Sequence, residues 1–471
     1  MENNILKLYN SRYKHINFGV QMRKLILYSL LLFILAGCSN SGNGELTGVK
    51  NRPRFYQPDP YGMVYIPAGS YTMGVGDEDM TSAQISEPKT ITVSAFYMDQ
   101  TEITNNEYRQ FVSWIRDSIA RTILAKSKPN TYLIPKNKKT GEVYDPPYLN
   151  SKAKIKWNGK TEVQELEQMY LPINERYFRK RQIDPRKLFY EYFWIDMKAA
   201  AAKEAASNGA VNGAWANRAQ GYKDRSVYVR HEKINVYPDT LTWIHDYSYS
   251  YNDPMTAKYF WHPAFDNYPV VGVNWNQARA FCIWRTQMME SNSGKKKNVV
   301  LNDFRLPTEA EWEWAARGGN TLSPYPWGGP YTRTAKGCFL ANFKPMRGDY
   351  AADGGATTMI VAHFPANDFG LYDMAGNVAE WTLDAFDESS YNMTWDMNPA
   401  YFYNTKETDP PAMKRKVIRG GSWKDVAHYI QTSTRSYEYQ DSAKCYIGFR
   451  CVQQYMGSQK KSNGSRSSRV Y

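Results

Sequence analysis

The stretch with the most potential for chemistry runs from Arg419 to Gln440 and reads RGGSWKDVAHYIQTSTRSYEYQ. Its double glycine predicts a turn, and its many aromatic residues are typical of a binding crevice. Its strongest potential nucleophiles are ordinary Ser, Thr and Tyr hydroxyls, and no acid or base partner is in view to activate them. The residues predict the wall of a crevice, for which Trp423, Asp425 and Arg435 are the candidate lining residues.

A second candidate site lies in DMAGNVAEW, residues 373–381. It combines two carboxylates, Asp373 and Glu380, with a Gly-Asn turn that can expose backbone carbonyls. Hard divalent cations such as Ca²⁺ prefer this mixture of oxygen ligands. The pattern predicts a calcium site, and the alternative is a turn that holds no metal.

The acidic residues of RLPTEAEWEWAARGG, residues 305–319, are expected to have a structural role. Pro307 can precede a helix that Thr308 or its neighbour caps, with Glu309 and Glu311 at the positive end of the helix dipole. These carboxylates are predicted to be caps and ion-pair partners rather than a catalytic acid pair. Because positions two apart diverge on a helix, Trp312 and its neighbour at 314 must face different surroundings.

The cysteines and histidines do not predict a zinc site. There is no CxxC pair, and the six histidines lack HExxH spacing. Apart from Cys38, the chain holds an even number of cysteines: Cys282, Cys338, Cys445 and Cys451. Four cysteines in an exported protein allow three disulfide pairings, and the residues alone do not choose among them.

Residues 1–37 have the features of a secretory signal peptide, with Met22 as an alternative start. The apolar run LILYSLLLFILA is shorter than the about 20 residues that span a bilayer. It ends in LAGC, which resembles a bacterial lipobox, so Cys38 is the expected lipid anchor. The alternative is an uncleaved anchor helix. Residues 38–60 are expected to be a lipidated tether, and Ser39 after the cysteine indicates the periplasmic face of the outer membrane.

The formal net charge is +13, concentrated partly in residues 121–160 and in a basic, Ser-rich tail at residues 456–471. For an exported lipoprotein, nucleic acid is not the expected partner of this charge. Anionic lipid headgroups or an acidic protein fit better, and a solvated basic face is the alternative.

The pattern of elements predicts short strands and a few helices. Residues 61–77 and 90–104 read as strands, and Thr104 with Glu107 forms a capping box for the helix that follows. Asn274 or Asn276 can cap a second helix, which buries Ala280, Phe281 and Trp284. Residues 120–258 are expected to be a large insertion, in which the composition of residues 188–206 favours a helix.

Seven motifs in order resemble the formylglycine-generating enzyme family, also called the sulfatase-modifying factor fold. They include PVVGV, RLPTEAEWEWAARGG, YPWGG, DMAGNVAEW, VIRGGSW and IGFRCV. The resemblance implies an α+β fold related to C-type-lectin-like domains, with little regular secondary structure and a large insertion. The family domain is then expected over residues 61–119 and 259–455.

The resemblance also implies site residues. One calcium site of the family corresponds to Asp373, Gly376, Val378 and Glu380. A second corresponds to Asn342, Phe343, Asp353 and Gly355. The family disulfide corresponds to Cys282 and Cys451. Calcium is thus the expected cofactor, in a structural role.

In the enzymes of this family, two cysteines five residues apart follow GGSW and bind copper. No cysteine lies between Trp423 and Arg435 here, where Asp425, Ile430 and residues 432–434 fill the interval. Thiolates suit Cu(I), whereas hydroxyls and carboxylates do not. The expectation is a pseudoenzyme without copper, in which Trp423, Asp425 and Arg435 line a vestigial crevice.

Further stretches resemble lipoproteins of the GldK/PorK type from the Bacteroidetes type IX secretion and gliding machinery. These are RPRFYQPDPYGMVYIPAGSYTMG and YPDTLTWIHDYSYSYNDPM. The resemblance implies a scaffold that assembles in a ring with a GldN/PorN-like periplasmic protein. Tryptophans of the insertion are candidate interface anchors or local core residues: Trp157, Trp194, Trp215 and Trp243.

Two other functions compete with the scaffold. One is a calcium-dependent lipoprotein that binds a peptide or glycan in the crevice. The other is an enzyme of different chemistry, in which Arg435 would bind an anionic substrate.

Overall fold

The computed structural model describes residues 57–75, 87–137, 140–197, 228–246, 253–293, 301–345, 349, 351–352, 354–406 and 408–456. The apolar run at 25–36, Cys38, Trp215, Asp353 and the tail beyond residue 456 lie outside these ranges. Among the described residues, no helix is both long and apolar enough to cross a membrane.

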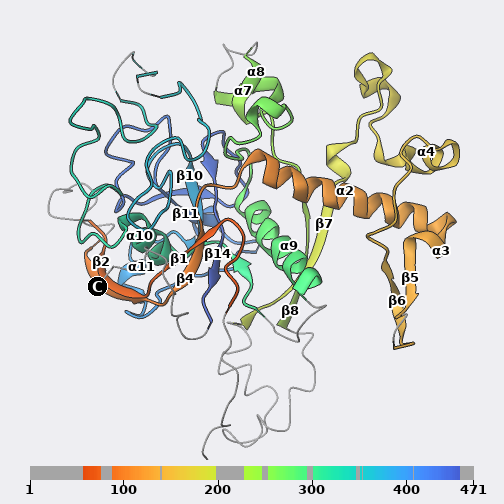
Figure 1. Cartoon of the computed structure of the whole chain (residues 1–471), viewed down its shortest axis with the longest axis horizontal. Helices are drawn as coiled ribbons and strands as arrows, with labels where there is room; N and C mark the ends of the chain where they lie inside the picture. The colour runs from red at the N-terminus through yellow and green to blue at the C-terminus, as the bar shows by residue number, and fades with distance from the viewer. Residues whose placement is uncertain are drawn as a thin grey trace, which may run out of the picture. The chain divides into compact units, whose positions relative to one another are not determined.

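Two four-stranded sheets form the centre of the family domain (Figure 1). The first has the order β1 (Met63–Ile66), β4 (Phe96–Asp99), β14 (Val452–Gln454) and β9 (Phe304–Arg305). The second has the order β12 (Ser436–Tyr439), β11 (Arg415–Arg419), β10 (Ala379–Ala385) and β13 (Ile447–Gly448). Each sheet joins strands from distant parts of the sequence, so neither forms from local pairing alone.

Three two-stranded ribbons and the helices complete the described elements. The ribbons are β2 (Gly69–Met73) with β3 (Lys89–Val93), β5 (Leu133–Lys136) with β6 (Val143–Leu149), and β7 (Phe189–Ile195) with β8 (Val229–Asn235). The α-helices are α2 (Asn105–Ser127), α3 (Pro129–Tyr132), α4 (Lys160–Leu166), α7 (Thr242–Asp246), α8 (Pro254–Lys258), α9 (Trp275–Ser293), α10 (Glu309–Arg317) and α11 (Ser390–Met393). This mixture of helices and strands confirms the α+β prediction.

Helix α2 begins where the sequence predicts. The side chain of Thr104 accepts a hydrogen bond from the Glu107 amide, and the Glu107 carboxylate accepts one from the Thr104 amide, which completes the capping box. The helix then continues to Ser127, through the expected start of the insertion at residue 120. Figure 1 shows α2 leading away from the sheets toward α3, β5, β6 and α4. The predicted boundary at residue 120 therefore falls inside a continuous helix.

Helix α9 packs against α2 in the largest core cluster. Asn274 caps α9, since its side chain accepts a hydrogen bond from the Gln277 amide at 2.9 Å. The predicted core positions of this helix, Ala280, Phe281 and Trp284, are buried. Phe281 stacks on Tyr108 of α2 with ring centroids 5.7 Å apart. The prediction for this helix is confirmed.

The helix predicted over residues 188–206 is wrong for the part that the structure describes. Phe189–Ile195 is strand β7, paired antiparallel with β8 along its whole length. Tyr190 and Tyr192 are buried, whereas Phe193 is exposed, so the side chains follow the two-residue period of a strand. Aromatic residues in alternation favour a half-buried strand more than the nearby alanines favour a helix.

A buried ion-pair network gives the fold a testable property. The carboxylate of Glu313 pairs with the guanidinium of Arg317 at 2.7 Å and also with that of Arg419, and all three side chains are at most 2% exposed. Removing one partner of a buried pair leaves an uncompensated charge, at a cost of about 3–5 kcal/mol. We predict that Glu313→Ala lowers the free energy of unfolding by this amount, measured by urea denaturation. Glu388→Ala, which removes an exposed carboxylate, should change it little. Equal effects of the two substitutions would refute the prediction.

Candidate functional site

Helix α10 carries the acidic motif, and its carboxylates serve the fold as the sequence predicts. Thr308 caps the helix and forms a capping box with Glu311. The Glu311 carboxylate pairs with both terminal nitrogens of Arg305 at 2.6 Å. Glu309 pairs with Arg435, with a distance of 2.6 Å from its carboxylate to Arg435 Nε. None of the three glutamates of this helix is therefore available as a catalytic acid.

The two tryptophans of α10 face different neighbours, as predicted. Trp312 is fully buried, and its indole N–H donates to the Glu380 carboxylate at 2.7 Å. Trp314 stacks on Tyr71 with ring centroids 5.3 Å apart and donates to the Pro67 carbonyl. One tryptophan thus contacts the DMAGNVAEW segment and the other fixes the β2–β3 ribbon.

Three buried carboxylates surround the turn of DMAGNVAEW. Asp373 and Glu380 were predicted from the motif, whereas Glu102 belongs to a distant part of the chain. The Glu102 carboxylate accepts hydrogen bonds from the Asn377 side-chain amide at 2.7 Å and from the Val378 amide at 3.1 Å. Each of the three carboxylates is at most 8% exposed.

One guanidinium offsets this negative charge in part. Arg450, from the GFRC motif, donates three hydrogen bonds to Glu380 at 2.6–2.9 Å. Burial, then the charges of Asp373 and Glu380, raise the pKa of Glu102 well above its usual range. Burial also raises the pKa of Asp373 to about 6. The site therefore holds three buried carboxyl groups beside one guanidinium, and burial favours the protonated forms of Glu102 and Asp373.

The two predicted calcium sites adjoin each other through Asn377. Its amide N–H donates to the Asn342 carbonyl at 2.8 Å, and the Asn342 side chain donates to Asn377 Oδ1 at 3.3 Å. Gly376 has φ +77°, and a Cβ there would lie 2.3 Å from the Asn342 carbonyl oxygen, so only glycine fits this approach. Of the remaining predicted ligands, Phe343 is buried and Gly355 donates its amide to the Met359 sulfur.

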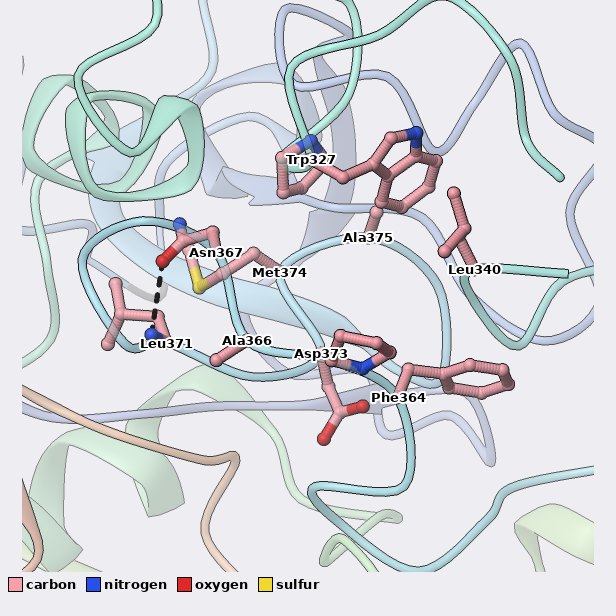
Figure 2. A pocket seen from close by; sticks show the side chains of 11 residues that line it. Trp327, Leu340, Phe364, Ala366, Asn367, Leu371, Asp373, Met374 and Ala375 are labelled. Carbon is pink, nitrogen blue, oxygen red and sulfur yellow. Dashed lines mark hydrogen bonds between the residues drawn. The ribbon is translucent and has the colours of Figure 1, made fainter. Parts of the chain in front are cut away.

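A small pocket adjoins Asp373. Figure 2 shows Trp327, Ala375 and Leu340 on one side of it and Phe364 and Asp373 on the other, with the carboxylate of Asp373 pointing away from Trp327. Apart from Asp373 and Asn367, the lining is apolar. The pocket offers no nucleophile paired with a base.

The candidate crevice residues pack in separate clusters. Trp423 is buried and stacks on Trp243 with ring centroids 6.1 Å apart. Asp425 accepts hydrogen bonds from the Ser422 amide and hydroxyl at 2.9 and 2.6 Å, which fixes the turn after the double glycine. Arg435 is buried against Glu309, and its Nη2 donates to the Ser390 hydroxyl at 3.0 Å. The guanidinium proposed to bind an anionic substrate is therefore engaged within the fold.

Residues 49–170 and 197–455 match the family model of the sulfatase-modifying factor enzyme 1-like domain. The chain belongs to this family. An inactive C-alpha-formylglycine-generating enzyme 2 from Bos taurus is 36% identical over 191 residues, which cover 39% of this chain and 50% of the relative. A formylglycine-generating enzyme from Mus musculus is 33% identical over 196 residues, covering 40% and 45%. The chain thus spans about half the length of these relatives, which include active and inactive proteins.

A solved structure, that of PvdO from Pseudomonas aeruginosa, aligns with 86% of this chain and 99% of its own, at 17% identity and a TM-score of 0.42.

The calcium that the sulfatase-modifying factor family implies fits this turn in its chemistry. Three buried carboxylates against one guanidinium favour a divalent cation, and carbonyl oxygens of the turn at Gly376 and Val378 are ligands of the type Ca²⁺ uses. Among the described residues, no three Asp, Glu, His or Cys side chains lie close enough to hold a metal by themselves. Glu380 is engaged by Arg450 and Trp312. Asp373, with the backbone carbonyls, is the better candidate to hold the cation, and Glu102 would add to the negative charge around it.

The interval in which the resemblance would place the copper cysteines holds no cysteine. Ile430 is fully buried in an aromatic cluster with Tyr325, Phe339 and Phe343. The carbonyls of residues 432–434 accept hydrogen bonds from the Arg419 guanidinium at 2.7–2.9 Å. Ile430 and residues 432–434 are thereby held in the core, whereas Val426 and Tyr429 of the same segment are exposed.

The tryptophans proposed as interface anchors make contacts within the chain. Trp157 lies under the Arg116 guanidinium, 5.0 Å from its ring centroid. Trp194 donates to the Glu232 carboxylate at 2.6 Å and lies 4.1 Å from the Arg279 guanidinium. Trp243 is buried against Trp423. For these three residues the observed packing agrees with the alternative role, that of local core residues.

Cys282 and Cys451 lie side by side in the core. Their sulfur atoms are 3.4 Å apart, which is longer than a disulfide bond of about 2.05 Å. Cys338 is exposed and Cys445 is buried. The geometry places the predicted pair within reach of oxidation, and the disulfide itself stays a prediction.

Oxidation of this pair can be tested directly. We predict that the protein from an oxidising compartment contains a Cys282–Cys451 disulfide, seen as a linked peptide in non-reducing mass spectrometry. Because the bond would close a loop of 169 residues, its reduction should lower the free energy of unfolding by about 2–5 kcal/mol. Cys338→Ser is the matched control and should behave as the wild type does. Two unlinked thiols in the exported protein would contradict the prediction.

Calcium binding has its own test. We predict that Ca²⁺ at a hundredfold excess over its Kd stabilises the wild type by about 2.7 kcal/mol, seen as a rise in Tm. Asp373→Asn should abolish most of this rise, because it removes a charge while Asn tolerates the left-handed backbone at φ 55°. Asp368→Asn, an exposed residue in the same segment, should keep the rise. An equal response to Ca²⁺ in both variants would show that Asp373 is not a ligand.

Proposed function

We propose that this protein is a non-catalytic, lipid-anchored scaffold of the outer membrane. It would assemble with a GldN/PorN-like periplasmic protein into a ring of the type IX secretion and gliding machinery. The proposed loss of catalysis rests on the residues that occupy the segment after GGSW. Buried Ile430 and the turn-capping Asp425 occupy the interval in which the family enzymes hold their copper cysteines.

The ion pairs support a structural use of this domain. Arg419 holds the carbonyls of residues 432–434, and Glu309 holds Arg435, so the former crevice wall is fixed by buried charge. A site that turns over substrate needs a nucleophile or a metal with an open position. A relative named as an inactive formylglycine-generating enzyme fits a family in which the domain persists without its chemistry.

The proposals of a lipid anchor and of a periplasmic partner rest on the sequence. The lipobox-like LAGC supports lipidation of Cys38, and the tether and the Tyr-rich stretch resemble lipoproteins of the secretion machinery. One acyl chain binds a membrane only marginally, whereas many anchored subunits in one ring bind collectively. Self-association into a ring would therefore retain the scaffold at the membrane.

A second candidate function is calcium-dependent binding of a peptide or glycan, in line with a C-type-lectin-like fold. A bound cation would favour the ionised forms of the buried carboxyl groups of Glu102, Asp373 and Glu380, which supports this candidate. Because all three carboxylates are buried, such a cation would stabilise the turn more readily than it would hold an exposed ligand. This favours the scaffold over the lectin-like function.

The scaffold is tested by purifying the tagged protein from its own outer membrane in mild detergent. We predict large rings in electron microscopy and a second protein in fixed stoichiometry by mass spectrometry. Expression of the tagged protein at its native level is the control for assembly caused by excess protein. A monodisperse monomer that carries no second protein would refute the scaffold.

A further inference from the structure

Residues 171–182 form a closed surface loop, called here the basic loop. The Leu171 amide donates to the Gln182 carbonyl at 2.9 Å, and Tyr170 and Ile183 form a β-bridge beside it. Compact surface loops whose ends are tied together are often functional. The basic loop falls between residues 170 and 197, the stretch that the family model does not match. Its features therefore do not belong to the shared domain.

Ion pairs brace the basic loop from inside. The Arg176 guanidinium donates to the Leu171 carbonyl at 2.7 Å and pairs with Glu167 at 2.5 Å. Arg186, just beyond the loop, pairs with Glu175 at 2.7 Å. These contacts fix the path of the chain, and Tyr170 and Ile183 at the base of the loop pack against a hydrophobic cluster that includes Leu166 and Met169.

The tip of the basic loop has a strained backbone. Phe178 has φ 49° and Arg179 has φ 55°, in the left-handed region that bulky residues rarely adopt. Such conformations cost of the order of 1–3 kcal/mol each and cluster at binding and switch regions. The ring of Phe178 packs edge-to-face with that of Tyr177, with 4.4 Å between centroids.

The tip exposes apolar and cationic side chains together. Ile173, Tyr177 and Phe178 are 74%, 69% and 76% exposed. Arg179 and Lys180 follow them directly, are exposed, and form no ion pair with any residue that the structure describes. Exposed aromatic residues beside available cations are the composition of an interface hot spot.

We propose that the basic loop docks onto an acidic surface of a partner protein. Tyr177 and Phe178 are the anchors that become buried, and Arg179 and Lys180 face the partner's carboxylates. This inference rests on the proposed function, because it names the surface through which the scaffold holds its periplasmic partner.

Charge and rigidity favour this occupant over two others. A second copy of the chain carries a net charge of +13 and would repel a basic loop. An acidic protein would attract it. A bilayer of anionic lipids accepts basic and aromatic side chains in many orientations and gains little from a fixed backbone. A loop held in one strained conformation lowers the ordering cost of docking onto a shaped protein surface.

The test uses the complex purified from the native membrane and a zero-length carbodiimide, which joins an amine to a carboxylate only in contact. We expect linked peptides between Lys180 and Asp or Glu residues of the stoichiometric second protein. Arg179→Glu/Lys180→Glu should lower recovery of that protein at least tenfold, and Phe178→Ala should lower it without changing charge. Lys152→Glu/Lys154→Glu is the control, since it makes the same charge change at exposed positions outside the loop.

Each other outcome overturns the inference. Wild-type recovery of the second protein by the loop variant, or Lys180 linked only to another copy of this chain, would exclude an acidic partner at this loop. The inference would also be wrong if the loop variant no longer sedimented with phosphatidylethanolamine–phosphatidylglycerol vesicles but still bound the second protein. If the loop variant keeps both ring and partner, the loop assignment fails and the scaffold stands. If the wild type has neither ring nor partner, the proposed function fails as well.

Discussion

Buried ion pairs between distant motifs are the constraint on which this fold depends. Arg450 binds Glu380, and Arg419 binds Glu313, with every one of these side chains at most 1% exposed. The described strands are short, so backbone pairing alone joins few residues in each sheet. A buried charge without its partner is costly, so each motif must meet its counterpart before the core can close. The packing of these motifs against one another thus depends on buried ion pairs as well as on hydrophobic contacts.

The same constraint is compatible with the non-catalytic role proposed for this domain. The guanidinium of Arg419 binds three carbonyls of residues 432–434, while Asp425 closes the turn that precedes them. Neither contact requires a thiol. Ile430 packs into an aromatic cluster. This surrounding is apolar, whereas a metal ligand would need polar neighbours. The shape of this segment therefore rests on contacts that do not depend on a cysteine.

Local signals in the sequence predicted local structure well. Thr104, Thr308 and Asn274 each cap the helix that follows, because a cap depends only on residues within one turn. The opposite orientations of Trp312 and Trp314 follow from helical geometry in the same way. Strand β7 was missed because its alternation is only seven residues long and adjoins an alanine-rich run that favours a helix.

Contacts between residues far apart in the sequence could not be predicted from local patterns. Glu102 accepts a hydrogen bond from the Val378 amide, 276 residues away, and nothing near Glu102 distinguishes it from an ordinary surface glutamate. Likewise, Arg435 looks available for a substrate until Glu309, 126 residues away, is seen to bind it. Only the tertiary structure reveals which charges are already paired.

This pairing also determines where the protein can interact with others. In the family domain, the prominent arginines of the motifs are satisfied by carboxylates or carbonyls of the same chain. The basic loop differs, because Arg176 is paired whereas Arg179 and Lys180 extend from a strained, exposed tip. A chain that uses its shared domain to neutralise its own charges must present new recognition groups on segments outside that domain. The basic loop lies in the stretch between residues 170 and 197 that the family model does not match, and its exposed tip is where we propose that such groups are presented.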